Sequence, residues 1–461
     1  MKKCDVLYIH PTKKMESDTS LRFGIMPMGI IGILNNLEAK GIKVLGYDYA
    51  IEKHLDPDFN LSSLLLETDY KILMTDLHWY EHSYGAIYIT ELSKRIKPNI
   101  PTIIGGYTST IFADEIINSF DSVDYILTGD SDLPSELLVD FLLGKGTKSL
   151  SDIPNLLYRE GFTAKRSSKS WVQTTLDNID FVNTDFFEHA DSIPFLSTKG
   201  VTLSSSERWL CVARGCKYNC SYCCGAMDNM NQLFGRCNII TRSPQKVSRD
   251  FYILTSQGID FIAPSHDFQM LGKDYYTSLF SEIRKMNFKP GLYLECFQLP
   301  TKNFIDDIAA TFDTKKTVIV ISPISGNETL REQNGKRFDN DSFYDIIYHI
   351  LSLKLCLQVY YTINPFGETR QQYEDTVFQM TYLKNVFKLG SKNVFYQQIV
   401  LDPLAGMRNV PGVEPTLNTF KDYYDYCLLP QTEHKYSGFD DNSEVPIQEK
   451  KQMYASMFEQ K

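Results

Sequence analysis

Three cysteines within eight residues offer the clearest chemistry in this sequence. Cys216, Cys220 and Cys223 form the pattern C-x3-C-x2-C, and Gly215 and Asn219 favour a loop there. Three thiolates that converge from one loop can hold an iron–sulfur cube and leave one iron open to another ligand. Zinc is the alternative metal, but residues 190–265 contain no histidine. The spacing therefore predicts a [4Fe–4S] cluster with one open iron.

The remaining cysteines carry weaker signals. The chain has 10 cysteines, and six of them lie between Cys211 and Cys237. A secreted disulfide scaffold would be short and evenly stapled, so we expect reduced thiols. Cys211, Cys224 and Cys237 would allow an auxiliary cluster, although buried structural thiols are commoner. Cys296 ends an expected strand, where it is either a candidate hydrogen-atom donor or a packed thiol.

Composition limits the class of protein. The 461 residues include 47 Lys+Arg and 57 Asp+Glu, which leaves a net charge of −10. This acidic balance argues against a protein held on nucleic acid by bulk charge. No run of 18 uninterrupted apolar residues occurs, and the apolar stretch before His10 is too short for a signal peptide. We therefore expect a cytoplasmic protein with no membrane and no nucleic-acid partner.

The N-terminal third alternates between strand and helix patterns. Apolar runs that predict strands lie at 5–10, 43–48, 70–75, 102–104 and 123–127, with helical patterns at 29–39, 84–96 and 111–120. Strands separated by helices of this length form βαβ units around a parallel sheet, and ligands of such sheets lie beyond the C-terminal strand ends. Polar residues 147–205 are expected as a linker with a small hairpin between 156–159 and 171–174.

A second α/β series starts at residue 206. Six candidate strands lie at 209–213, 261–263, 291–295, 318–322, 358–363 and 393–400, with helical patterns between them. Six βα units are too few for a closed eight-stranded barrel, so a partial barrel is expected over 206–404. The tyrosine-rich region 405–461 ends in an expected helix at 446–458.

Several motifs together resemble one enzyme family. The cysteine loop is similar to the signature of the radical S-adenosylmethionine (SAM) enzymes, and nearly the whole chain resembles the subgroup with an N-terminal cobalamin-binding domain. The individually weaker motifs, which occur in the family's order, are 26–29 (MPMG), 104–109 (IGGYTS), 124–132 (DYILTGDSD), 153–159 (IPNLLYR), 363–369 (INPFGET) and 401–407 (LDPLAGM). The resemblance implies an α/β protein: a Rossmann-like cobalamin-binding domain (1–146), the linker (147–205), a partial (β/α)6 radical SAM barrel (206–404) and a C-terminal cap on the substrate side (405–461).

The resemblance also implies how SAM is held. The open iron chelates SAM, one electron from the reduced cluster cleaves it, and the 5′-deoxyadenosyl radical abstracts a hydrogen atom. Tyr222 would lie beside the adenine, and Glu295, Ser322 and Ser325 at strand ends are candidate SAM contacts. The sequence departs from the family at Ile324, where glutamate is common. A satisfied cap or turn is the alternative role for these polar strand ends.

Cobalamin contacts are implied in the N-terminal domain. Gly105 and Gly106 directly follow a strand, where glycine lets the backbone approach a ligand closely, although a plain tight turn is the alternative. In the loop after the third strand, His78 or Trp79 would lie under cobalt as a ligand or as a cover, unless this is only a half-buried aromatic cluster. The other candidate contacts are Met28, Gly29, Ser109, Gly129 and Asp130.

The function implied is a cobalamin-dependent radical SAM methyltransferase that acts on an unactivated carbon. Its cofactors would be a [4Fe–4S] cluster, SAM and cobalamin, with a reducing partner such as flavodoxin or ferredoxin. A radical rearrangement, cyclisation or ring contraction is the alternative, with cobalamin as an electron carrier or absent. A non-enzymatic iron–sulfur or cobalamin carrier is a third possibility, against which the open three-cysteine site argues. The short C-terminal region favours a small-molecule substrate over a peptide.

Overall fold

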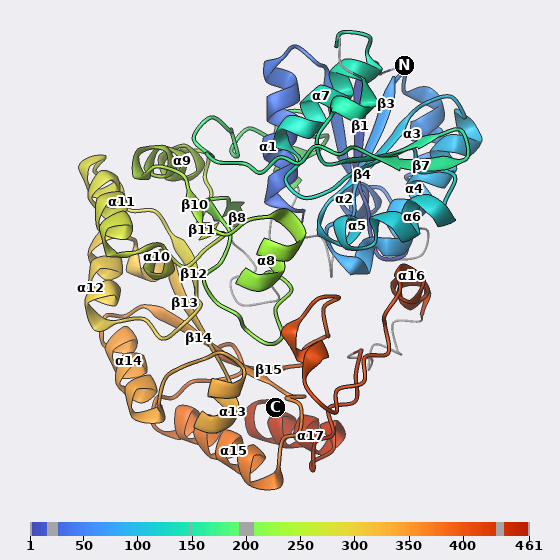
Figure 1. Cartoon of the computed structure of the whole chain (residues 1–461). Coiled ribbons are helices and arrows are strands. Elements are labelled where there is room, and N and C mark those ends of the chain that lie inside the picture. Colours follow the sequence, from blue (N-terminus) through green and yellow to red (C-terminus); the bar gives the residue numbers. More distant parts are fainter. Residues whose placement is uncertain (1, 16–25, 147–148, 193–206, 430–437, 460–461) are drawn as a thin grey trace. The chain divides into compact units, whose positions relative to one another are not determined.

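The computed structural model divides into two compact units, which are described separately (Figure 1). It describes residues 2–15, 26–146, 149–192, 207–429 and 438–459. The first unit comprises Met1–Ser197, Asn231–Arg236 and Leu417–Glu433, and the second comprises the rest of the chain. The helix α8 (Met227–Phe234) spans the division. The domain limits inferred from sequence stay predictions.

The first unit is built on a seven-stranded sheet of order β2-β1-β3-β4-β5-β6-β7. The first five strands run parallel, as the βαβ pattern predicts, and β6 and β7 are antiparallel additions at one edge. The strands are β1 (Val6–His10), β2 (Val44–Asp48), β3 (Ile72–Asp76), β4 (Thr102–Gly105), β5 (Tyr125–Leu127), β6 (Leu156–Glu160) and β7 (Thr163–Arg166).

The hairpin expected in the linker exists, but its second strand was assigned wrongly. β6 pairs with Thr163–Arg166 rather than with residues 171–174, and the turn is only Gly161-Phe162, with Gly161 at φ +62°. Three of the four side chains of β7 are exposed, so it lacks the apolar alternation that marks a strand in sequence. The hairpin extends the sheet of the first unit instead of standing alone.

Alternate side chains of β1 enter two different cores. Val6 and Tyr8 pack with α1 and α7, whereas Leu7 and Ile9 pack with α3 and α4. This period of two places a helical layer on each face of the sheet, as the apolar parallel strands require. The helices of the unit are α1 (Met28–Ala39), α2 (Tyr49–Leu55), α3 (Leu61–Glu67), α4 (Ser83–Ile96), α5 (Tyr107–Ile111), α6 (Ala113–Ser119), α7 (Asp132–Leu142) and α16 (Phe420–Leu428).

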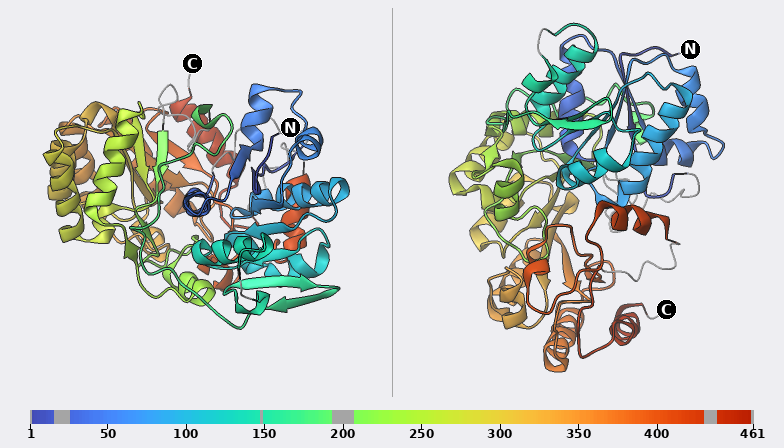
Figure 2. Two further views of the ribbon diagram at one scale, coloured as in Figure 1. Left: turned by 90° about the horizontal axis from the view of Figure 1, so that it is seen from above. Right: turned by 45° about the vertical axis from the view of Figure 1, so that its right-hand side comes forward.

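The second unit is built on a six-stranded parallel sheet of order β15-β14-β13-β12-β11-β8. Helices line one side of this curved sheet, as Figures 1 and 2 show, which is the partial barrel expected from six βα units. The strands are β8 (Glu207–Leu210), β11 (Phe261–Pro264), β12 (Leu292–Cys296), β13 (Thr317–Ile324), β14 (Cys356–Thr362) and β15 (Val394–Gln397), beside the small ribbon of β9 (Ala213–Arg214) and β10 (Ile240–Thr241).

Helices follow the strands of this unit, as the βα pattern predicts. The helix α15 (Arg370–Asn385) begins at a capping box, in which Thr369 and Gln372 exchange side-chain and backbone hydrogen bonds. The helices are α9 (Pro244–Ser256), α10 (Phe268–Leu271), α11 (Lys273–Lys285), α12 (Lys302–Thr311), α13 (Glu328–Gln333), α14 (Asn340–Ser352), α15 (Arg370–Asn385) and α17 (Ile447–Phe458).

Candidate functional site

The three signature cysteines lie in one loop of the second unit, between β9 and α8. Cys216, Cys220 and Cys223 are partly exposed and form no disulfide. The loop turns tightly, because the Cys223 amide donates to the Cys220 carbonyl oxygen at 3.2 Å. The Tyr218 amide donates to Cys216 Sγ at 3.4 Å, the kind of N–H···S contact that stabilises a thiolate. The loop is therefore compact and its thiols are accessible to a metal.

Residues from the C-terminal end of β11 hold the start of this loop. Ser265 bonds His266 Nδ1, and His266 Nε2 lies 2.8 Å from the Gly215 carbonyl oxygen, to which it can donate. Asp267 caps α10 by accepting the Gln269 amide and also accepts the Phe297 amide. His266 and Asp267 therefore form an ordered, hydrogen-bonded turn beside the cysteine loop.

Two more distant segments hold the end of the loop. Ser221 donates to Asn334 Oδ1 at 2.6 Å, and its carbonyl oxygen accepts the Met407 amide at 2.6 Å. The Cys224 amide donates to Asp402 Oδ2 at 3.2 Å. Met407 and Asp402 belong to the 401–407 motif, so this motif holds the end of the cysteine loop by two hydrogen bonds.

Burial opposes ionisation of the thiols while the loop carries no metal. It raises the pKa of Cys216, and it raises the pKa of Cys223 to about 12, with the nearby Asp402 carboxyl contributing. A cluster must therefore displace protons from these thiols, and its assembly releases protons. Burial likewise raises the pKa of Asp402 to about 6.

Lys336 is a functional candidate that sequence reasoning missed. Its ammonium is buried, donates to the Phe297 carbonyl oxygen at 2.7 Å, and is attracted by Cys220 and Glu295. Burial lowers the Lys336 pKa against that attraction. The preceding Gly335, at φ +86°, lies so close to the loop that a Cβ would be 3.1 Å from Cys220 Cα. No strand-end pattern marks this position, which follows α13.

The expected SAM contacts fall into two groups. Glu295 and Ser322 retain accessible surface on β12 and β13, and Tyr222 packs beside the apolar cluster around Leu401 and Met407. Ser325 is buried: its hydroxyl lies 3.0 Å from Thr376 Oγ1 and accepts the Asn327 amide. The cap role considered for these residues thus describes Ser325, and a SAM role for the other three stays a prediction.

Polar groups gather on the face of the sheet that carries Glu295. Glu207 and Glu295 both act electrostatically on Tyr360, whose pKa is raised to about 12, chiefly by burial. The Tyr360 hydroxyl donates to Gln358 Oε1 at 2.9 Å. Cys296 follows Glu295 directly and is buried, so it points to the opposite face. This orientation disfavours Cys296 as a hydrogen-atom donor on the polar face.

The Gly-Gly loop of the first unit packs on the chain's own backbone. Gly106 has φ +124°, and a Cβ there would lie 2.7 Å from the backbone of Leu77 and His78. The Thr108 and Ser109 amides donate to the His78 and Leu77 carbonyl oxygens. Gly105 differs, because its nearest neighbours would be 3.7 Å or more from a Cβ. The tight turn considered for this pair accounts for Gly106, and a ligand contact at Gly105 stays a prediction.

Of the other expected cobalamin contacts, some have open space beside them and others are already bonded within the chain. A Cβ on Gly29, at the start of α1, would meet nothing within 4 Å, which leaves room beside Met28. Asp130 is instead occupied by an ion pair with the buried Arg236, and it also accepts the Gln173 amide. The sequence did not predict this ion pair, because Arg236 lies more than a hundred residues from Asp130 along the chain. The Gly129 amide is likewise bonded by Thr110 Oγ1.

His78 and Trp79 form an aromatic cluster after β3. Their rings are 4.5 Å apart and T-shaped, and the His78 ring also meets Tyr107 at 5.9 Å. Burial lowers the pKa of His78 to about 4, so its imidazole is neutral at physiological pH, the form that binds metals. A cobalt-facing role for either residue stays a prediction.

Comparisons with known proteins place the fold in one class. No family model and no curated protein matches the sequence. Solved structures do match, and two that each cover 95% of the chain are radical SAM enzymes solved with cobalamin. The chain therefore has the fold of that class, as the motifs predict.

Two of these structures serve as references. TsrM from Kitasatospora setae, a radical SAM methyltransferase solved with cobalamin and a [4Fe–4S] cluster, matches at TM-score 0.66 and 16% identity over 95% of this chain and 83% of its own. OxsB, a cobalamin-dependent SAM radical enzyme solved with aqua-cobalamin, matches at TM-score 0.59 and 12% identity, over 95% of this chain and 57% of its own.

Within the part of the chain that is described, no helix has the length and apolar character to cross a membrane.

Proposed function

We propose that the chain is a cobalamin-dependent radical SAM enzyme, and that it methylates an unactivated carbon of a small molecule. The observation that carries the first part is the three-thiol loop, anchored at the C-terminal end of β11 in a six-stranded partial barrel. Support for methyl transfer is the likeness to TsrM, which is a methyltransferase. A flavodoxin or ferredoxin as electron donor and a cytoplasmic location belong to the same proposal.

The residues present fit the three cofactors. Cys216, Cys220 and Cys223 supply three accessible thiols from one loop, which suits a cluster with one open iron. SAM carries a cationic sulfonium and a cationic ammonium group. The carboxylates of Glu207 and Glu295, which share one polar face of the barrel, suit such a ligand by charge. For cobalamin, open space lies beside Gly29 in the first unit, and a Cβ at Gly105 would make only ordinary contacts, so that position is not crowded.

These cofactors, when bound, supply one-electron cleavage of SAM and a transferable methyl group. The chain's own residues set the conditions. Lys336 places a buried positive charge near Cys220 and favours a more negative, reduced cluster, whereas Asp402 near Cys223 opposes it. Both residues act on the cluster through their electric charge and do not bind it.

The test is product analysis of the reconstituted full-length protein with hydroxocobalamin, SAM and reduced flavodoxin. We expect 5′-deoxyadenosine from radical cleavage and S-adenosylhomocysteine from methylation of the corrinoid. Cys216→Ala should abolish 5′-deoxyadenosine, and Cys356→Ala, on an exposed thiol of β14, is the matched control that retains it.

Two outcomes would contradict separate parts of the proposal. Radical cleavage retained by Cys216→Ala would refute the cluster assignment. Radical cleavage by a corrinoid-free protein, without S-adenosylhomocysteine, would leave a radical SAM enzyme and refute methyl transfer in favour of a rearrangement or cyclisation.

A further inference from the structure

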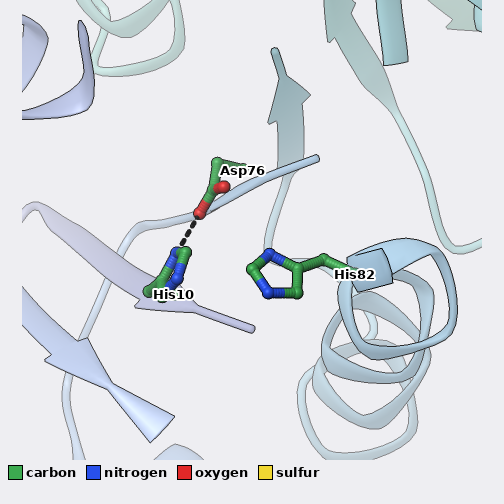
Figure 3. Close-up of side chains that lie close together, drawn as sticks. All are labelled: His10, Asp76 and His82. Atoms are coloured by element: carbon green, nitrogen blue, oxygen red, sulfur yellow. Dashed lines mark hydrogen bonds and ion pairs between the residues drawn. The ribbon is translucent and has the colours of Figure 1, made fainter. Parts of the chain in front are cut away.

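Two histidines and an aspartate meet inside the first unit (Figure 3). His10 ends β1 and Asp76 ends the neighbouring strand β3, and His82 closes the 3₁₀ turn Tyr80–His82 that follows. The register pairs Ile9 with Thr75, so His10 and Asp76 are lateral neighbours on one face of the sheet. All three side chains are at least 95% buried.

Their contacts leave a carboxylate oxygen unused. Asp76 Oδ1 lies 2.7 Å from His10 Nδ1 and accepts the Tyr8 hydroxyl at 2.6 Å. Asp76 Oδ2 is buried without a hydrogen-bond partner. The rings of His10 and His82 are 5.0 Å apart and nearly perpendicular, and Figure 3 shows both beside the Asp76 carboxylate.

A second buried carboxylate lies one strand further along. Asp48 pairs with His10 across β2 and β1, and its Oδ1 caps α2 while Oδ2 has no partner. Two carboxylates and two imidazoles thus share the C-terminal edge of the sheet. Burying anionic oxygen without a partner is costly, and a cation held between these groups would remove the cost.

We propose that His10, Asp76 and His82 bind a divalent first-row transition ion of the Zn²⁺ type. Two imidazoles and one carboxylate suit zinc, whereas magnesium and calcium prefer all-oxygen sites. One ligand atom from each residue already lies within 4.8 Å of the others. Zinc bonds of about 2.1 Å at tetrahedral angles place ligand atoms about 3.4 Å apart, so small side-chain rotations complete the site.

The ion takes the place of the proton between His10 Nδ1 and Asp76 Oδ1. Asp76 Oδ2, which has no partner, allows the carboxylate to bind the ion through both oxygens, and Tyr8 remains as the outer hydrogen-bond donor that orients it. Three protein ligands leave one position for water. From the imidazolium form of His10, binding releases the Nδ1 proton to solvent; from the neutral form, that proton moves to Nε2 of the same ring. No electron moves in either case.

The site also has a structural consequence. Asp76 and His82 bracket residues 77–81, so an ion bound to both, and to His10 on β1, ties this loop to the sheet at both ends. The loop carries His78 and Trp79, whose aromatic cluster it would hold in place. The inference stands on the first unit alone and does not depend on the proposed function.

The test uses the full chain with Cys216, Cys220 and Cys223 changed to serine, so that zinc cannot bind the cluster thiols. The protein is expressed without cobalamin, loaded with ZnCl₂, desalted, and analysed by plasma mass spectrometry. We expect about one equivalent of zinc more than in the His82→Phe variant, which keeps a ring but removes both ligand nitrogens. His54→Gln, an exposed histidine on α2, is the matched control that keeps the zinc.

Hydrogen exchange gives a second readout that does not need a destabilised variant. Zinc at about 100 times its Kd should slow exchange of the most protected β1 and β3 amides about 100-fold in the parent. In His82→Phe these amides should stay protected but no longer respond to zinc. Equal zinc content and equal zinc response in His82→Phe and His54→Gln would overturn the proposal, and so would a parent that neither holds zinc nor responds to it.

Discussion

Gly106→Ala is expected to destabilise the first unit by about 3 kcal/mol. Gly106 has φ +124° and ψ −176°, a region that only glycine occupies readily, and forcing another residue into it costs about 2 kcal/mol. The new Cβ would also lie 2.7 Å from the Leu77 and His78 backbone. Moving that backbone would weaken a bond from the Thr108 or Ser109 amide, at about 1 kcal/mol.

Two other glycines of the same unit separate these causes. Gly144 has φ +70° but nothing within 4 Å of a Cβ, so Gly144→Ala tests the backbone conformation alone, at about 1 kcal/mol. Gly105→Ala would make only ordinary contacts at 3.7 and 3.8 Å, and its expected effect is within about 0.5 kcal/mol. The three variants therefore form a graded series within one unit.

Native-state hydrogen exchange is the appropriate assay, because a chain of two units need not unfold in one step. The most protected amides of β1 and β3 should exchange about 100-fold faster in Gly106→Ala and about fivefold faster in Gly144→Ala, and Gly105→Ala should match the parent. A Gly106→Ala effect no larger than that of Gly144→Ala would refute the argument that backbone packing requires this glycine.

Three further predictions concern the second unit. Lys336→Met should lower the reduction potential of the reconstituted cluster by on the order of 100 mV, because it removes a buried positive charge that stabilises the added electron by about 2 kcal/mol. Lys336→Arg should leave the potential unchanged, and an unchanged potential of Lys336→Met in an EPR redox titration would contradict the argument. Asp402→Asn should raise the reduction potential of the cluster. In the cluster-free protein, the pKa of Asp402 is about 6, above its value in the unfolded chain, so the parent should lose stability as pH rises from about 4 to about 6. Asp402→Asn should remove this loss, and urea unfolding measured against pH checks the slope. Lys450→Met should destabilise this unit by about 4 kcal/mol, because it leaves Glu368 buried without its cation, and Lys450→Met with Glu368→Gln should recover part of the loss in urea unfolding.

Local patterns carried much of the fold. Continuous apolar runs and helical spacing are properties of neighbouring residues, so the strands β1 to β5 and the six strands of the partial barrel were predictable within a few residues. The strand β7 was missed because its side chains are polar and its pairing depends on the two-residue turn at Gly161. Edge strands of this kind are specified by a partner rather than by their own periodicity.

The cysteine loop was also a local property. Cys216, Cys220 and Cys223 are close in sequence, so their spacing alone indicates that they can share a metal. Lys336 and Asp402 were not predictable, because they reach the loop from segments more than a hundred residues away. What surrounds the loop electrostatically is decided by the order of the strands, not by the motif.

The sequence by itself determined the two α/β series, the three-thiol loop and the order of the motifs, because each depends on residues near one another along the chain. Only the tertiary structure decided that Gly106 faces backbone, that Asp130 pairs with Arg236, and that His10, Asp76 and His82 meet. The strand order β2-β1-β3 brings together side chains 66 positions apart, and a long-range pairing of that kind leaves no period in the sequence.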